Sequence, residues 1–182
     1  ITQGKPVVTN MKWNTDESEQ KSILLSIEKQ SEHPLAEAVV SMLNGEETVR
    51  VQNFESITGK GAKADYLGQT YWVGNQALMD ENNIVMDETL AEKAVLWSRE
   101  SKTVIWFANS ESVLAGIALA DPIKSTSKEA ISKLKHMGIA VYMLTGDNFT
   151  TAQAIAREAG ITGFEAEVLP IQKAEFVKRL QA

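Results

Sequence analysis

A short apolar run that leads through a glycine turn into a helix constrains the fold of this chain most. Residues 139–144 have the length and composition of a buried strand. Thr145, Gly146 and Asp147 follow, and apolar residues at helical spacing then continue to Gly160. A strand that feeds directly into a helix is typical of parallel α/β sheets, which bind ligands at the carboxyl ends of their strands. Because helix N-terminal amides favour phosphate there, the pattern predicts a phosphoryl group near Thr145 and Gly146; the alternative is an ordinary strand–helix turn.

The composition excludes several classes of protein. The longest apolar runs are far shorter than the ~20 residues of a membrane span, and the 43% hydrophobic content of the 182 residues is typical of a soluble globular chain. A net charge of −6 without a basic stripe argues against nucleic acid as a partner. No secretory leader opens the chain. With no cysteine, disulfides and thiolate metal sites are excluded, and we predict no metal site.

The first two thirds of the chain have the pattern of an α+β unit. Asn14 and Glu17 resemble a capping box before a helix. Pro34 separates that helix from a second one, which stops near Gly45, because the residue before a proline avoids the helical conformation. The elements predicted next are short strands between residues 48 and 73, a short helix after Gly74-Asn75, a helix at 88–99, and a hairpin of strands 103–108 and 113–120. Residues 1–8 are predicted to be a connection.

After Pro122 the pattern alternates between helices and strands. The predicted elements are a helix at 125–137, the strand at 139–144, a helix at 150–160, a short strand near Glu167-Val168 and a helix at 171–180. This alternation predicts a parallel, doubly wound sheet with right-handed crossovers. Only about two strands are present, which is too few for a stable sheet of this class, so this unit is predicted to be incomplete.

Four short segments carry residue types that can bind a ligand. His33, next to Glu32 and Pro34, can stack on a planar ring or hydrogen-bond a phosphate; the alternative is an exposed histidine in a turn. Gly59-Lys60-Gly61 allows a ligand close to the backbone, or is an ordinary turn. Gly74-Asn75 is a second such turn or a plain helix cap. Lys173 can neutralise a phosphate or lie on the surface.

These motifs together resemble the cytosolic region of heavy-metal P-type ATPases. The run Ser-Glu-His-Pro-Leu at 31–35, the two glycine motifs and Thr-Gly-Asp-Asn at 145–148 occur in the order found in those pumps, and the resemblance covers essentially the whole chain. It implies an α+β nucleotide-binding domain, residues 11–118. This domain would be inserted in a haloacid-dehalogenase-like α/β phosphorylation domain, residues 1–10 and 119–182, which is incomplete in this sequence.

The resemblance also assigns roles to individual residues. It implies ATP binding by Glu28, Glu32, His33, Gly59, Gly61, Gly74 and Asn75. Glu28 would accept a hydrogen bond from the exocyclic amine of adenine. It implies stabilisation of the transferring phosphate by Thr145, Gly146, Asp147 and Lys173, and a place beside the hinge for Asp121. Ala62 and Lys124 depart from the family pattern, which usually has a larger aliphatic residue and an arginine at these positions.

The activity implied by the resemblance is ATP-driven ion transport across a membrane through an aspartyl-phosphate, with ATP and Mg²⁺ as cofactors. Copper is the most frequent ion in this branch; zinc, cadmium or lead are the alternatives. The partners would be the actuator and membrane domains, with this region monomeric at the cytoplasmic face. In the family the nucleophilic aspartate stands in the signature Asp-Lys-Thr-Gly-Thr, which would directly precede Ile1. These residues alone are therefore expected to bind ATP without hydrolysing it, with a dissociation constant of about 0.1–10 mM.

Two hypotheses from other functional classes remain as alternatives to the ion pump. A free-standing dehalogenase-type phosphatase requires a nucleophilic Asp-x-Asp near the amino terminus, and no such motif precedes the first predicted helix. A non-catalytic nucleotide-binding module would share the ATP site, so these residues do not distinguish it from the ATP-binding part of a pump.

Overall fold

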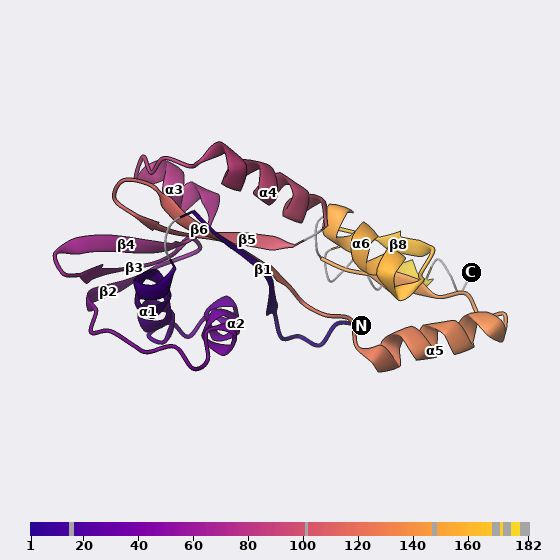
Figure 1. Ribbon diagram of the computed structural model, residues 1–182. Coiled ribbons are helices and arrows are strands. Elements are labelled where there is room, and N and C mark those ends of the chain that lie inside the picture. Colours follow the sequence, from indigo (N-terminus) through magenta and orange to yellow (C-terminus); the bar gives the residue numbers. More distant parts are fainter. Residues whose placement is uncertain (15–16, 101, 147–148, 169–171, 173–175, 179–182) are drawn as a thin grey trace. The chain divides into compact units, whose positions relative to one another are not determined.

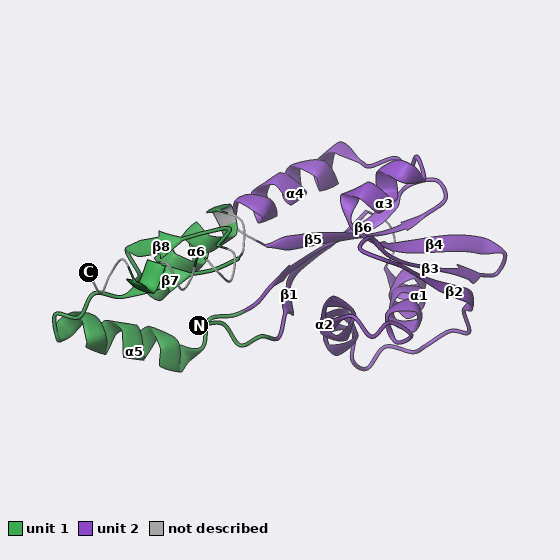
Figure 2. Cartoon of the chain, turned by 180° about the vertical axis from the view of Figure 1, so that it is seen from behind, with its two compact units in different colours: residues 1–4, 122–182 green, residues 5–121 purple. Residues whose placement is uncertain are grey.

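The computed structural model describes residues 1–14, 17–100, 102–146, 149–168, 172 and 176–178. The chain forms two compact units, Lys5–Asp121 and the combination of Ile1–Gly4 with Pro122–Ala182 (Figure 2). No helix in the described ranges is both long and apolar enough to cross a membrane.

A six-stranded antiparallel sheet forms the centre of the larger unit. Its strands are β1 (Val7–Trp13), β2 (Gln52–Ile57), β3 (Gly61–Tyr66), β4 (Gln69–Gly74), β5 (Thr103–Asn109) and β6 (Val113–Ala120). They lie in the order β1-β6-β5-β4-β3-β2. β6 is the most buried strand, with seven of its eight residues buried, because it lies between β1 and β5 and has no alternating polar residues.

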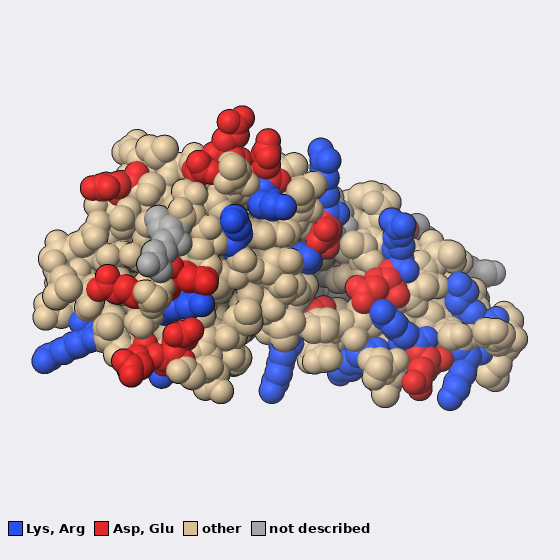
Figure 3. Space-filling view, viewed as in Figure 1, with Lys and Arg blue, Asp and Glu red and all other residues tan. Residues whose placement is uncertain are grey.

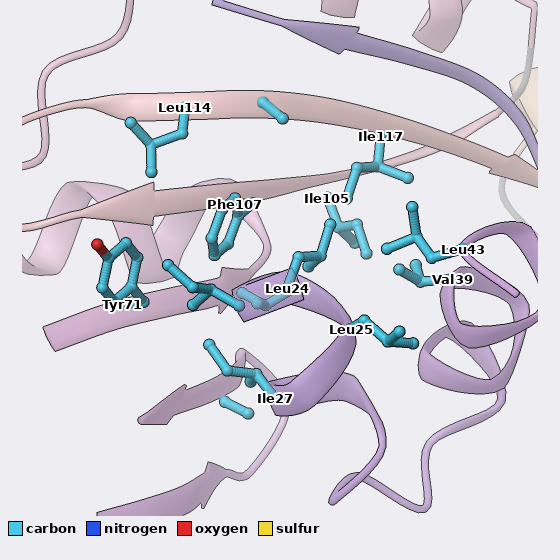
Figure 4. Packing of buried hydrophobic residues seen from close by; sticks show 14 of the residues in the cluster. Leu24, Leu25, Ile27, Val39, Leu43, Tyr71, Ile105, Phe107, Leu114 and Ile117 are labelled. Carbon is cyan, nitrogen blue, oxygen red and sulfur yellow. The ribbon is translucent and has the colours of Figure 1, made fainter. Parts of the chain in front are cut away.

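Helix pairs cover the two faces of this sheet (Figure 1). The pairs are α1 (Ser18–Glu28) with α2 (Pro34–Met42), and α3 (Gln76–Glu81) with α4 (Glu88–Arg99). The first pair packs on Ile105, Phe107 and Ile117, and Figure 4 shows Leu25 of α1 beside Val39 of α2 in this core. The second pair packs on a separate cluster on the opposite face. Each fully buried large aliphatic or aromatic side chain contributes about 1.5–3 kcal/mol to these cores.

The α+β prediction for this unit is confirmed, with differences at its amino-terminal end. Residues 7 and 8 are not a connection but the start of β1, which pairs with β6 along its length through one irregularity between Val8 and Asn10. The predicted capping box is wrong: Glu17 is the N-cap of α1, and no side-chain hydrogen bond caps this helix. β2 begins at Gln52, four residues after the start of the region predicted to hold short strands.

The chain enters and leaves the larger unit through paired segments. The Lys5 amide donates to Asp121 Oδ1 at 3.3 Å. In the smaller unit, Thr2 bridges to Ile123, and the Gln3 amide donates to the Pro122 carbonyl at 2.9 Å. The expected domain boundaries, after residue 10 and before residue 119, fall inside β1 and β6, both of which belong to the larger sheet.

The smaller unit has the predicted α/β pattern. Its elements are α5 (Ser125–His136), β7 (Tyr142–Leu144), α6 (Phe149–Ala159) and β8 (Gly163–Glu165). β7 and β8 form a parallel pair, which packs on α6 through Met143, Ala152 and Ala156. β8 precedes the predicted position at Glu167-Val168, and β7 starts three residues later than residue 139. Most of the predicted helix at 171–180 lies outside the described residues; residues 172 and 176–178 are helical.

Charged side chains of both signs are distributed over the surface. On the face shown in Figure 3, lysines and arginines alternate with aspartates and glutamates and do not form a continuous basic patch.

Candidate functional site

A cavity of about 470 Å³ in the larger unit is lined by four segments that are far apart in its sequence. It is lined by Glu28, Ser31, His33, Leu35 and Ala36, by residues 56–62 and 73–75, and by residues 103–105. Six of the seven residues predicted to bind nucleotide are among them: Glu28, His33, Gly59, Gly61, Gly74 and Asn75. Glu32 does not line the cavity and is exposed.

Glu28 is an acidic residue in an apolar position. It is the last residue of α1 and is only 5% exposed. No hydrogen bond or ion pair with another described residue reaches its carboxyl group. Burial raises the pKa of the Glu28 carboxyl from 4.5 to about 7. Near neutral pH this group therefore exists in both protonation states, and it can donate or accept a hydrogen bond in the cavity.

His33 begins the second helix and also lines the cavity. Its Nδ1 accepts a hydrogen bond from the Leu35 amide at 3.2 Å, and its own amide donates to Ser31 Oγ at 3.3 Å. Pro34 follows at the first helical position, where a missing N–H costs nothing. Because Nδ1 accepts, the neutral ring carries its proton on Nε2, which is then a donor. His33 is thus an exposed residue in the turn between the two helices, and it also lines the cavity.

The two glycines Gly61 and Gly74 lie opposite each other on β3 and β4. A Cβ atom on Gly61 would lie 2.0 Å from the Val73 carbonyl oxygen, and one on Gly74 would lie 2.2 Å from the Lys60 oxygen. Gly61 also has a φ of +149°, which side-chain-bearing residues rarely adopt. The strands approach too closely here for any side chain, so the sheet itself requires both glycines, independently of a ligand.

Asn75 joins the glycine turn to the helix that follows β4. Its Oδ1 accepts from the Leu78 amide at 3.1 Å and caps α3. Its Nδ2 donates to the Gly59 carbonyl at 3.0 Å, and its amide donates to the Lys60 carbonyl at 2.8 Å. The plain helix cap, which was the alternative to a ligand-binding turn at Gly74-Asn75, is present. The same Asn75 side chain also holds the Gly59 end of the cavity wall in place.

Replacing Asn75 by alanine is expected to lower the free energy of unfolding by about 1–2 kcal/mol, because a helix cap and a hydrogen bond to Gly59 are both lost. Urea denaturation measures this change. Asn82→Ala is the matched control, since the Asn82 side chain makes one hydrogen bond among the described residues, to the Leu78 carbonyl, at the other end of α3. Equal losses in the two variants would show that the link to the glycine turn contributes nothing.

The apolar walls of the cavity were not predicted from the sequence. Leu35 follows the helix break, Val73 and Ile105 lie on neighbouring strands, and the small side chain of Ala62 leaves space between them. The available signal was the alternation along the strands, which gives the facing direction of each side chain. The alternation does not predict which strands are neighbours in the sheet. The cavity depends on the pairing of β5 with β4, so its walls could not be predicted from this pattern.

The second group of predicted site residues lies in the smaller unit. Thr145 directly follows β7; its amide donates to the Glu165 carbonyl at 3.1 Å, and its carbonyl accepts from the Val168 amide at 2.9 Å. Gly146 is exposed. Asp147 and Lys173 lie outside the described residues. The loop at Thr145 is thus held by backbone hydrogen bonds at the carboxyl end of a parallel strand, the position at which such sheets bind ligands.

Metal ligands are not clustered in the part of the chain that the structure describes: no group of three or more histidine, aspartate or glutamate side chains there could hold an ion. The described residues therefore do not form a protein cage for Mg²⁺, which requires several oxygen ligands in octahedral geometry.

Known proteins resemble this chain in both sequence and fold. Residues 1–182 match the family model of haloacid dehalogenase-like hydrolases. The chain is 40% identical, over its full length and 26% of the relative, to "Probable copper-transporting ATPase PacS" of Synechocystis sp.. It is 36% identical, with the same coverage, to "Probable cadmium-transporting ATPase" of Staphylococcus aureus. A crystal structure of a zinc-transporting PIB-type ATPase in the E2.Pi state superposes with a TM-score of 0.85 at 28% identity, over 99% of this chain and 29% of that one.

The chain therefore belongs to the haloacid dehalogenase-like hydrolases. Within that class its relatives are heavy-metal P-type ATPases, the family that the sequence motifs indicated. It spans about a quarter of the length of the curated relatives it matches.

Proposed function

We propose that this chain is the ATP-binding part of a heavy-metal-transporting P-type ATPase, and that the cavity beside Glu28 holds the adenine ring. The observation that carries the proposal is a buried carboxyl without a partner among the described residues, facing a cavity of 470 Å³. Natural ligand sites have about 300–1,000 Å³, apolar walls and a few polar groups that fix the orientation of the ligand.

The residues around the cavity match the parts of a nucleotide. The Glu28 carboxylate accepts from the exocyclic amine of adenine, and His33 Nε2–H supplies a donor at the same end. Leu35, Val73 and Ile105 offer apolar surface to the faces of the ring. The sugar and phosphates of the nucleotide would then extend toward the turn at residues 59–61, which also lines the cavity.

The chemistry of the parent protein follows from the second group of residues. In the proposed pump, ATP phosphorylates an aspartate and the aspartyl-phosphate drives ion transport, while Thr145, Gly146, Asp147 and Lys173 stabilise charge on the transferring phosphate. Mg²⁺ neutralises the phosphates and enters with ATP, since Mg²⁺ is usually bound through substrate phosphates and water. The motif Asp-Lys-Thr-Gly-Thr does not occur in these 182 residues, so we expect this chain to bind ATP without hydrolysing it.

The remaining parts of the proposal concern the parent protein. We assign copper as the transported ion because the relative at 40% identity carries copper in its name, with cadmium, zinc and lead as alternatives. The partners of this region are the actuator and membrane domains, and its place is the cytoplasmic face, where ATP is available. ATPase stimulation of the full-length protein by Cu⁺, Cd²⁺, Zn²⁺ and Pb²⁺ compares the four ions directly.

An ATP titration followed by amide NMR shifts tests the binding site. ATP and adenosine are expected to shift Glu28, His33, residues 59–61 and Asn75, and GTP is expected to bind more weakly because its O6 cannot donate to Glu28. His33→Ala should weaken ATP binding several-fold. His33→Asn is the matched variant, because asparagine keeps the helix cap and removes the ring.

The two histidine variants separate the functions of this residue. Weak binding by both variants assigns the ring to the nucleotide, whereas wild-type binding by His33→Asn would reduce His33 to a helix cap. If neither ATP nor adenosine shifts the residues of the cavity, the proposed function is wrong.

A further inference from the structure

Lys60 lies at the mouth of the cavity on a backbone that is fixed from both sides. Its amide donates to the Ile57 carbonyl at 3.0 Å, and its carbonyl accepts from the Asn75 amide at 2.8 Å. Its neighbours Gly59 and Gly61 carry no side chains. The lysine side chain therefore starts from a defined point beside the cavity, and its ammonium group is the part that can move.

Lys60 is also the only lysine or arginine among the described residues that line the cavity. The other titratable side chains there are Glu28 and His33, and neither is a permanent cation. A ligand that carries several negative charges thus meets one side-chain cation at this site. If adenine occupies the end near Glu28, the phosphates extend toward the glycine turn that carries this lysine.

In the structure the ammonium group of Lys60 is bound by an acidic residue. Lys60 Nζ donates to both carboxylate oxygens of Glu81, at 2.7 and 2.9 Å. The two side chains are 37% and 54% exposed, so solvent screens the pair and a multiply charged phosphate can replace the carboxylate. Glu81 is the last residue of α3, where the helix dipole disfavours a negative charge. Nothing in the helix therefore favours an acid at this position.

We propose that Lys60 binds the nucleotide phosphates and that Glu81 competes with them for its ammonium group. This inference rests on the proposed function. The ion pair lowers the affinity for ATP, and it lets the site respond to the number of phosphate charges. Lys60 must leave Glu81 to bind phosphate, so only a ligand with sufficient negative charge makes the exchange favourable.

The exchange predicts opposite effects for the two partners, measured as dissociation constants for adenosine, AMP, ADP and ATP by NMR titration. Lys60→Gln should weaken ATP binding about 5–10-fold and leave adenosine unchanged, because one charge-assisted contact to phosphate is lost. Glu81→Gln should tighten ATP binding about 3–10-fold, again without an effect on adenosine. The double variant should behave like Lys60→Gln, since Glu81 acts only through the lysine.

The chain contains a matched control pair. Lys63 and Glu55 lie on the adjacent strands β3 and β2, form an ion pair at 2.9 Å, and are 37% and 60% exposed. Neither residue lines the cavity. Lys63→Gln and Glu55→Gln change the net charge by the same amounts as the test variants, so any effect of overall charge on ATP binding appears in both pairs.

The outcomes separate this inference from the proposed function. The inference stands if the ratio of ATP affinity to adenosine affinity falls in Lys60→Gln and rises in Glu81→Gln. The same ratio should stay unchanged in Lys63→Gln and Glu55→Gln. It is overturned if ATP and adenosine bind but the ratio is unchanged by Lys60→Gln, or if the control pair changes it equally. Absence of binding by both ATP and adenosine to the wild type would instead reject the proposed function.

Discussion

Replacing Glu28 by glutamine is expected to stabilise the folded protein above pH 7 by up to about 3 kcal/mol while it weakens ATP binding. Burial raises the pKa of the Glu28 carboxyl from 4.5 to about 7, and this difference is the cost of ionising the carboxyl group in the folded state relative to the unfolded state. Glutamine keeps the shape of the side chain but cannot ionise. It therefore removes the cost, together with the carboxylate that would accept from adenine.

The sign of the effect sets its pH window. Below pH 4.5 the carboxyl is protonated in both the folded and the unfolded chain, and the variant gains nothing. Between pH 4.5 and 7 the unfolded chain loses this proton while the folded chain keeps it, so the wild type becomes less stable as the pH rises. Above about pH 7 the carboxyl is ionised in both states and the difference becomes constant.

Urea denaturation at pH 4.5, 6, 7 and 8 measures this dependence. Glu37→Gln is the control, because Glu37 is exposed on the surface of α2. We expect the difference between Glu28→Gln and wild type to increase over this range and the control to change little. A Glu28→Gln difference that is the same at every pH would show that the carboxyl is not desolvated as the structure indicates.

The second large effect is expected at Gly61. An alanine there should cost at least about 3 kcal/mol of unfolding free energy, because its Cβ would lie 2.0 Å from the Val73 carbonyl oxygen at an unfavourable φ of +149°. The strands β3 and β4 would have to separate at the wall of the cavity. ATP binding should therefore be lost together with stability, since residues on both strands line the cavity.

Gly68→Ala is the control for backbone strain alone. Gly68 lies in the turn between β3 and β4 with a φ of +82°, and a Cβ there would meet no atom within 4 Å. Its expected cost is about 1–2 kcal/mol, the cost of placing a side-chain-bearing residue in the left-handed region. Thermal and urea denaturation of both variants provide the comparison. Similar costs would mean that β3 and β4 can separate easily at Gly61.

These two residues illustrate different reasons for an unusual amino acid. Gly61 is required by the approach of two strands, so a loss of ATP binding in its variants would not by itself identify a ligand contact. Glu28 is the reverse case, because a buried carboxyl without a partner among the described residues lowers stability. Such groups are characteristic of binding and catalytic sites, where function compensates for the loss of stability.

Much of the fold could be predicted from local patterns. The helix break at Pro34, the hairpin of β5 and β6, and the change to alternating helices and strands after Pro122 all follow from periodicity and from backbone restrictions of single residues. β1 was missed because Thr9 and Asn10 interrupt its apolar pattern; this strand exists because β6 offers a partner along its length.

Short motifs and local periodicity are properties of neighbouring residues, so they were sufficient to predict most of the elements, the division into an α+β and an α/β unit, and the family. Three features became known only from the packed structure: Glu28 is buried, Gly61 lies opposite Gly74, and Lys60 forms an ion pair with Glu81, 21 residues further along the chain. These facts depend on strand register and on packing between distant segments. Local side-chain preferences do not specify such long-range pairings, and the candidate site is built from them.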